Sequence, residues 1–178
     1  MAARFSAPEC CPTRDDGLIG RLVDVWEASV RATHDFLDEA DIRRIRPQVV
    51  GALRAVPDLR IVRDASGLPV AFMGVEGRRL EMLFVDPSCR SMGVGTALVR
   101  EAIGRGVDGV TVNEQNPAAR GFYEHLGFVV SGRSERDEQG GPFPILYMKL
   151  KDVFIKPSAE PCLRGLCRSE KTKRETQR

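Results

Sequence analysis

A short glycine-containing stretch, residues 90–95, has the composition of an anion-binding loop. It lies between an apolar run, Leu83 to Val85, and an amphipathic segment that begins at Thr96. A strand, loop and helix in this order place main-chain N–H groups at a helix N-terminus, where they lack intrahelical partners and the helix dipole is positive. Gly93 and Gly95 carry no Cβ, so a phosphate can approach the main chain closely. The spacing predicts a pyrophosphate site.

Two common phosphate-binding motifs do not fit this stretch. A P-loop has a lysine before its Ser or Thr at the helix start, whereas here Gly95 is followed directly by Thr96. A dinucleotide-binding motif has a third glycine and a later acidic residue, but this chain has Leu98 near that position and no acid closing residues 109–113. A glycine pair alone is equally typical of a tight turn, so its meaning depends on the sequence downstream.

The segment from Asn113 to Phe128 supplies a second pattern. Asn116 is a good N-cap because Pro117 follows it at the first helical position. The helix is expected to end near Gly127, which suits a left-handed C′ position. Tyr123 follows Phe122 on this helix, and consecutive helical side chains point about 100° apart. One ring can therefore pack inward while the other faces a cleft.

The elements that position these patterns follow from hydrophobic periodicity. A first helix is predicted from Asp15 or Asp16 to about Val30, and a second from Glu39 to Val56, in which Pro47 should begin a new segment or kink the old one. A third helix is predicted from Met92 to about Ile103. Strands are expected at 59–62, 69–75, 83–85, 109–113, from 128 and at 142–150, with a weaker signal near 3–5.

The composition limits which classes of protein this chain can belong to. The chain has 178 residues, 42% hydrophobic and 29% charged, which suits one globular domain. We expect a cytoplasmic protein with no membrane partner, since no apolar run approaches a span and no signal peptide is recognised. Five cysteines without such a signal indicate a reducing compartment, and with only two histidines we expect no metal site. The net charge of +2 is no argument for nucleic acid, and we expect none as a partner.

Together the two patterns resemble the cofactor-binding motifs of the GNAT superfamily of N-acetyltransferases. Arg90-x-x-Gly93-x-Gly95 is similar to the acetyl-CoA pyrophosphate motif, and residues 113–128 are similar to the second cofactor-binding segment. The segments 33–37 and 132–146 further resemble a small bacterial subgroup. The resemblance implies a domain over 1–156, followed by a flexible basic tail over 157–178.

The resemblance also implies a fold and an activity. The fold would be α/β (α+β), with a mixed, strongly twisted sheet of six to seven strands flanked by about four helices. The sheet would splay between the strands ending at Val85 and Asn113, and acetyl-CoA would lie in that split. The activity would be transfer of the acetyl group to a primary amine, on a small molecule or a protein, by direct attack in a ternary complex. The protein would be a monomer or a homodimer.

Residue roles follow from the same resemblance. Main-chain groups of Phe84 and Val85 would pair with the pantetheine and polarise the acetyl carbonyl, and Asn116 would contact the pantetheine arm. Tyr123 occupies the position of the usual general acid, which protonates the departing thiolate. The alternative is that its ring only packs against the cofactor. The pyrophosphate would be held by Arg90, Ser91, Met92, Gly93, Val94, Gly95 and Thr96.

The general base remains open. Glu81 shares a strand face with Leu83 and Val85 by the two-residue period, but it can equally be an ion-paired carboxylate. His34 is the other candidate because its reference pKa of about 6.5 suits base work near neutrality. Bulk water can also take the proton.

Substrate-side candidates come from two connections. Thr33 and His34 lie at the joint of the two predicted helices, although capping explains such residues as well. Ser134, Asp137 and Tyr147 lie in and after the polar connection that would wall the acceptor site, although an exposed hairpin is an equal reading. Two other functions stay open: a non-catalytic acyl-CoA-binding sensor, and a nucleotide-binding module that the missing lysine disfavours.

Overall fold

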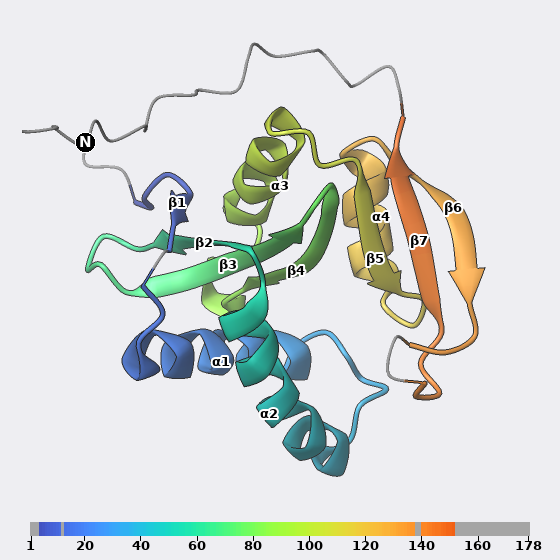
Figure 1. Ribbon diagram of the computed structural model, residues 1–178, viewed down its shortest axis with the longest axis horizontal. Helices are drawn as coiled ribbons and strands as arrows, with labels where there is room; N and C mark the ends of the chain where they lie inside the picture. Colours follow the sequence, from blue (N-terminus) through green and yellow to red (C-terminus); the bar gives the residue numbers. More distant parts are fainter. Residues whose placement is uncertain (1–3, 12, 138–139, 152–178) are drawn as a thin grey trace, which may run out of the picture.

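A computed structural model of the chain describes residues 4–11, 13–137 and 140–151, and the predicted tail lies outside them. The helices are α1 (Asp16–Arg31), α2 (Glu39–Ala55), α3 (Val94–Gly104) and α4 (Pro117–His125), with a short 3₁₀ turn at Pro87–Cys89. The strands are β1 (Glu9–Cys10), β2 (Asp58–Arg63), β3 (Pro69–Glu76), β4 (Arg79–Val85), β5 (Gly109–Asn113), β6 (Phe128–Ser134) and β7 (Ile145–Leu150). Figure 1 shows them in space.

The described strands form one mixed sheet of seven, in the order β1-β2-β3-β4-β5-β7-β6. All neighbours are antiparallel except β4 and β5. These two run parallel and are paired only at Arg79 with Gly109 and Leu80 with Val110. Beyond Leu80 the strands separate, as Figure 1 shows. The predicted splay is confirmed, and it leaves one edge of β4 without a strand partner.

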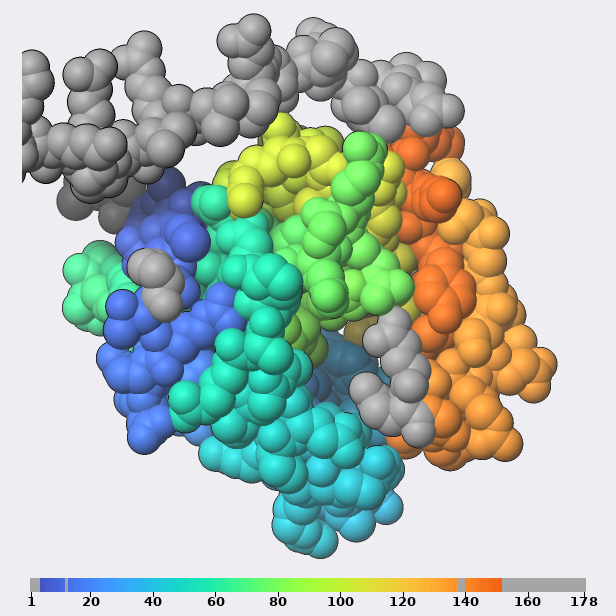
Figure 2. Space-filling view, in the orientation of Figure 1, coloured from blue at the N-terminus to red at the C-terminus, as the bar shows by residue number. Residues whose placement is uncertain are grey.

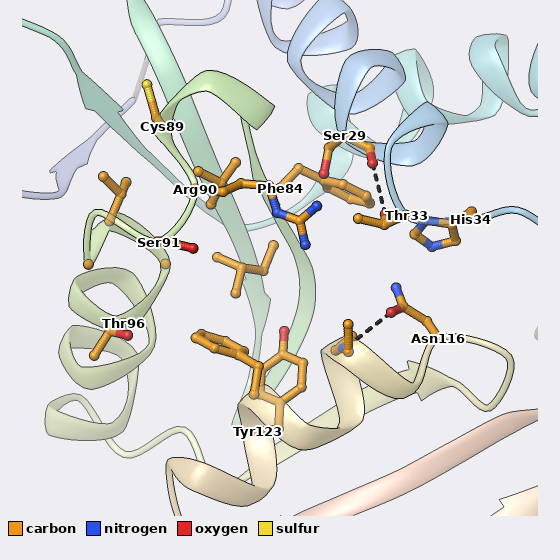
Figure 3. Close-up of a pocket in the computed structure, with 18 residues that line it drawn as sticks. Ser29, Thr33, His34, Phe84, Cys89, Arg90, Ser91, Thr96, Asn116 and Tyr123 are labelled. Carbon is orange, nitrogen blue, oxygen red and sulfur yellow. Dashed lines mark hydrogen bonds between the residues drawn. The ribbon is translucent and has the colours of Figure 1, made fainter.

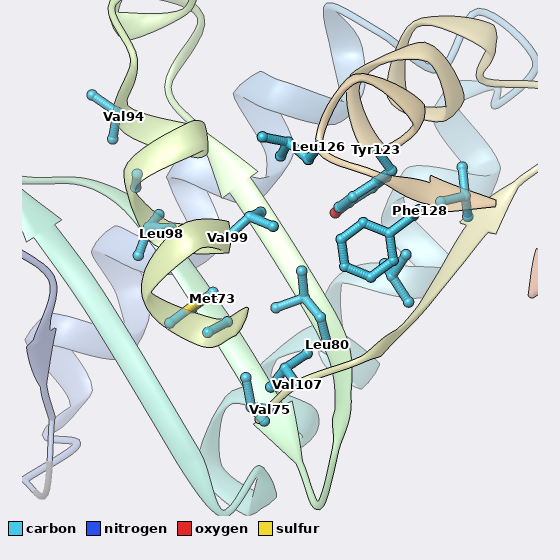
Figure 4. Packing of buried hydrophobic residues seen from close by; sticks show 14 of the residues in the cluster. Met73, Val75, Leu80, Val94, Leu98, Val99, Val107, Tyr123, Leu126 and Phe128 are labelled. Atoms are coloured by element: carbon cyan, nitrogen blue, oxygen red, sulfur yellow. The ribbon is translucent and has the colours of Figure 1, made fainter. Parts of the chain in front are cut away.

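Each face of the sheet carries two helices. The amphipathic helices α1 and α2 bury residues such as Trp26 and Leu53 against Ile61 and Phe72. On the opposite face, α3 and α4 pack against the sheet around Leu98 and other apolar side chains (Figure 4). In the space-filling view α2 covers the front of the molecule beside the half that contains β6 and β7 (Figure 2). No helix in the described part of the chain is long and apolar enough to cross a bilayer.

The predicted helices are confirmed with one shifted boundary. Asp15 caps α1 by accepting from the Leu18 amide at 2.8 Å, as expected for its position. The third helix begins at Val94 and not at Met92. The reason is that Ser91 and Gly93 take φ values of 59° and 82°, which an α-helix does not allow. Pro47 was expected to begin a new segment or to kink the old one, and the expectation of a new segment is wrong, because α2 is one continuous helix from Glu39 to Ala55.

Three strand predictions need correction. The strand expected at 83–85 begins at Arg79, because its ladder with β3 continues to the pair of Glu76 and Arg79. The last strand begins at Ile145 and not at Pro142, since neither Pro142 nor Pro144 has an N–H to donate to a ladder. At the other end of the chain, Phe5 makes only an isolated bridge with Asp64, and the first strand is β1 at Glu9–Cys10. The short length of β1 explains why its sequence gave no clear period.

Candidate active site

A cavity of about 450 Å³ lies beside the split between β4 and β5. Its walls come from the end of α1, the end of β4, the loop into α3, and the first turns of α4 (Figure 3). The lining residues are Ser29, Thr33, His34, Leu83, Phe84, Val85, Cys89, Arg90, Ser91, Gly93, Val94, Gly95, Thr96, Asn116, Ala118, Ala119, Phe122 and Tyr123. The predicted pyrophosphate loop, cofactor helix and helix joint therefore meet at one place.

The loop into α3 presents its amides to this cavity. Within the described residues, no acceptor is found for the main-chain N–H groups from Ser91 through Thr96, and no side chain caps α3. The left-handed backbone at Ser91 and Gly93 turns the chain sharply before the helix begins. Nothing lies within 4 Å of the place where a Cβ on Gly93 would stand. The loop has the open space and the unpartnered donors that an anion requires.

The side chains of this loop differ in their placement. Arg90 lines the cavity, and its guanidinium is directed into it (Figure 3). Met92, which was expected to take part in the same loop, is exposed and does not line the cavity. A cation beside unpartnered amides strengthens the attraction for a phosphate group. The electrostatic character of the loop therefore comes from Arg90 and the main chain.

The register of β4 decides which main-chain groups face the split. The Asp86 amide donates to the Val70 carbonyl at 2.8 Å, and Phe84 lies opposite Phe72 on β3. Because hydrogen-bonded pairs alternate along an antiparallel ladder, Phe84 directs its main-chain groups toward β3. The groups of Leu83 and Val85 point the other way, into the split. The expectation of main-chain pairing by Phe84 is thus corrected to Leu83, and Phe84 lines the cavity.

Asn116 is the N-cap of α4 and is buried, with 7% of its surface exposed. Its Oδ1 accepts from the Ala119 amide at 3.0 Å, which is the capping bond expected from the sequence. This bond fixes the side chain, so that the Nδ2 group is directed toward Thr33 and His34 (Figure 3). The amide nitrogen can therefore donate to a carbonyl group in the cavity.

Tyr123 lies at the floor of the cavity with its hydroxyl directed inward (Figure 3). Its ring is held edge-on between Phe122 and Phe128, with centroid distances of 5.1 and 5.8 Å. Figure 4 shows the same ring among the core side chains. Burial raises the pKa of Tyr123 above its ordinary value. The phenol is therefore protonated, and a donor, across the neutral range.

His34 and Thr33 stand across the cavity from Tyr123, just after α1. The Thr33 Oγ1 lies 2.8 Å from the Ser29 carbonyl oxygen and 2.8 Å from Nδ1 of His34. Burial lowers the pKa of His34, the Val30 carbonyl raises it, Arg90 lowers it and Asp35 raises it, with a net lowering. A neutral imidazole in a polar cavity can accept a proton.

Glu81 does not line the cavity. It forms an ion pair with Arg79, and its side chain is only 18% exposed. The ladder pairs Gly74 with Met82 and Val75 with Leu80, so Glu81 is the extra residue of a β-bulge. The bulge breaks the two-residue period on which its expected alignment with Leu83 and Val85 was based.

The other acceptor-side candidates lie outside the cavity as well. Ser134 donates through Oγ to the Arg136 carbonyl at 2.7 Å, and Asp137 accepts from the Gly141 amide at 2.6 Å. These bonds shape the connection between β6 and β7. Tyr147 lies in β7 opposite Thr111 and next to Gly132. The structure brings Thr33 and His34 to the cavity but not these three residues.

Several lining residues were not predicted from the sequence. They are Ser29, Leu83, Cys89, Ala118, Ala119 and Phe122. Ala119, Phe122 and Tyr123 follow helical spacing from a capped start, so the face of α4 could have been deduced. Ser29 is four residues before Thr33, but its burial depends on how α1 packs and carries no signal in the sequence.

Comparisons with known proteins identify the family of this chain. A family model described as an acetyltransferase (GNAT) domain matches residues 61–151. Peptidyl-lysine N-acetyltransferase YjaB of Salmonella typhimurium is 42% identical over 128 residues, which cover 71% of this chain and 87% of YjaB. The solution structure of apo YjaB from Escherichia coli has a TM-score of 0.73 at 36% identity, covering 82% of this chain and 96% of that one.

A more distant structure shares the fold. The PaiA N-acetyltransferase of Thermoplasma acidophilum, solved in complex with coenzyme A, has a TM-score of 0.56 at 18% identity and covers 81% of this chain and 99% of its own. At that identity the likeness concerns architecture alone. The family model and the YjaB relatives go further, because they span the cofactor loop and α4. The chain therefore belongs to the GNAT acetyltransferase family and is an N-acetyltransferase.

Proposed function

We propose that this enzyme transfers the acetyl group of acetyl-CoA to the side-chain amine of lysine in a peptide or protein. The observation that carries the proposal is the row of amides from Ser91 through Thr96, which have no acceptor in the described part of the chain and lie at the edge of a cavity that extends to Tyr123 and His34. The acceptor class is supported by the YjaB relatives, which are named peptidyl-lysine N-acetyltransferases.

The residues present fit acetyl-CoA. The amides of the loop and Arg90 would hold the pyrophosphate, and the free edge of β4 at Leu83 and Val85 would pair with the amides of the pantetheine arm. Asn116 would donate to the same arm through Nδ2. A bound acetyl-CoA supplies an activated acyl group in the form of a thioester.

The cavity also has groups suited to acyl transfer. A main-chain N–H on the free edge of β4 can stabilise negative charge that develops on the acetyl oxygen. Tyr123, kept protonated by burial, can donate to the sulfur as the carbon–sulfur bond breaks. His34 lies on the other side of the cavity, where it can take the proton that the amine loses. Glu81 has no place in this scheme, since it is paired with Arg79 outside the cavity.

Binding and turnover together test the proposal. Thermal-shift titration of the full chain with acetyl-CoA, coenzyme A, ATP and NAD reports the ligand, and thiol release with a lysine peptide reports catalysis. We expect acetyl-CoA and coenzyme A to raise the melting temperature and thiol release to depend on the peptide. Protection by ATP or NAD alone would overturn the cofactor assignment. Protection by acetyl-CoA without release on any amine would favour the sensor function.

A further inference from the structure

The hydroxyl of Thr33 is held between two acceptor-capable atoms. It lies 2.8 Å from the carbonyl oxygen of Ser29, one helical turn earlier, and 2.8 Å from Nδ1 of His34. The His34 amide donates to the Val30 carbonyl at 2.8 Å, so the end of α1 fixes the main chain on which both side chains stand. These contacts join the last turn of α1 to the imidazole that lines the cavity (Figure 3).

These contacts determine which nitrogen of the ring carries the proton. A carbonyl oxygen can only accept, so the single hydroxyl hydrogen of Thr33 goes to Ser29. The Thr33 oxygen can then only accept from the ring, and Nδ1 of His34 must carry a hydrogen. The opposite arrangement would place two lone pairs against each other at 2.8 Å, between Thr33 and Ser29. The neutral ring therefore keeps its lone pair on Nε2.

We infer that Thr33 is a positioning residue, which holds His34 with its proton on Nδ1 so that Nε2 can accept the proton of the acceptor amine. This inference rests on the proposed function. The neutral amine attacks the thioester carbon, a carbon–nitrogen bond forms, and the proton of the nitrogen passes to Nε2. The carbon–sulfur bond breaks and the thiolate takes up a proton, so the sum is one amide and one thiol.

Two charged groups act on His34 besides its own hydrogen bonds. Arg90, from the loop after β4, disfavours the imidazolium, and Asp35, from the connection after α1, favours it. Neither group specifies a tautomer, because each acts on the total charge of the ring. The Val30 carbonyl also acts on the ring and raises the pKa of His34, and the choice between Nδ1 and Nε2 follows from the hydrogen bond to Thr33.

Nitrogen-detected NMR of the imidazoles tests this inference without any turnover. The chain has only two histidines, and His125 is exposed at the end of α4. We expect His34 to be the Nδ1–H tautomer, and His125 to show the usual mixture as an internal control. Thr33→Val removes the acceptor at similar volume and should abolish the preference, whereas Thr33→Ser should retain it. An Nε2–H tautomer for wild-type His34 would overturn the inference even if acetyl transfer occurs.

Kinetics with the same variants connect the tautomer to catalysis. If the neutral amine and neutral His34 are both needed, the logarithm of kcat/KM rises with a slope of about two below the pKa of His34 and about one above it. We expect Thr33→Val to lower kcat at least about tenfold, with an unchanged KM for acetyl-CoA, and Thr33→Ser to restore it. Equal rates in Thr33→Val and wild type would contradict the inference. Absence of transfer by wild type would instead reject the proposed function.

Discussion

Arg21 on α1 and Asp86 at the end of β4 form an ion pair of 3.0 Å that joins the helical layer to the loop into α3. Arg21 also donates through Nε to the Pro69 carbonyl at 2.8 Å. Asp86 in turn accepts from the amide and the hydroxyl of Ser88, at 3.1 and 2.7 Å, which closes the turn before Arg90. The start of the loop into α3 is therefore held by a residue that is 65 positions away in sequence.

Replacing Arg21 should loosen this turn. We expect Arg21→Gln to lower the free energy of unfolding by about 1–2 kcal/mol, because a half-buried carboxylate loses a charged donor. It should also raise the KM for acetyl-CoA more than it lowers kcat. Arg44→Gln is the matched control, since its pair with Asp41 on α2 is exposed and should contribute little to stability. Similar losses of stability in both variants would refute the structural role of Arg21.

The same pair predicts acid sensitivity. Burial acts to raise the pKa of Asp86, but hydrogen bonds from Ser88 and Arg21 outweigh it, and the pKa lies below its ordinary value. A carboxylate with a depressed folded-state pKa stabilises the protein above its unfolded pKa of about 3.9, and that stability is lost as the pH falls through the folded value. Urea unfolding as a function of pH should therefore show a smaller acid loss for Arg21→Gln than for wild type. An identical pH dependence would argue against the coupling.

We predict that a glycine is needed at position 93 because of its left-handed backbone conformation, and not because a side chain would clash with neighbouring atoms. With φ at 82° and nothing within 4 Å of the Cβ position, Gly93→Ala should cost about 1–2 kcal/mol of stability through left-handed strain. Gly67→Ala is matched to it, with φ at 87° and equally open surroundings in the turn between β2 and β3. Calorimetry should show similar losses for the two variants. Only Gly93→Ala should weaken coenzyme A binding. Equal coenzyme A affinity in the two variants would show that the loop does not take part in cofactor binding.

Tyr123→Phe should separate catalysis from binding. Removing a hydroxyl that faces the cavity should lower kcat by about 10²-fold while leaving the KM for acetyl-CoA and the melting temperature nearly unchanged. Tyr147→Phe is the available control, since it removes the hydroxyl of the other tyrosine, which lies in β7 outside the cavity. The measurement is steady-state kinetics, which gives kcat and the KM for acetyl-CoA of the two variants. If Tyr123→Phe turns over like wild type, the protein is still an acetyltransferase but Tyr123 is not its general acid.

Glu81→Gln should have little effect on the rate. The carboxylate is paired with Arg79 and lies outside the cavity, so we expect kcat within about twofold of wild type at every pH. The pH profile of kcat/KM for this variant is the relevant measurement. A large loss that is strongest near neutral pH would identify Glu81 as the base in place of His34.

The sequence was sufficient for all four helices and most strands, and for most of the residues that line the cavity. Asn116 with Pro117 marks the start of α4, and the positions of Gly93 and Gly95 mark the loop, because capping and glycine conformations are local properties. The cavity brings together the predicted cofactor residues other than Met92. These residues lie together because of the order of the strands in the sheet. A family resemblance indicates that order, whereas composition does not.

The remaining site residues depend on tertiary details. The bulge at Glu81 is visible only in the register between β3 and β4, so a simple two-residue period misplaced its side chain. The register also explains why the main-chain groups of Leu83, and not those of Phe84, face the split, since the ladder decides which groups point away from β3. The contact between Thr33 and His34 requires the end of α1, where the chain turns back toward Ser29. No spacing rule encodes these contacts.

The most direct test of the account is mass spectrometry of a peptide with one internal lysine and a blocked N-terminus, incubated with the enzyme and acetyl-CoA. We expect one added acetyl group on the lysine, which forms only when enzyme is present and forms more slowly with Tyr123→Phe. A control peptide with arginine in place of lysine should remain unmodified. No acetylation of the lysine peptide, with acetyl-CoA bound and intact, would contradict the proposed acyl transfer to lysine.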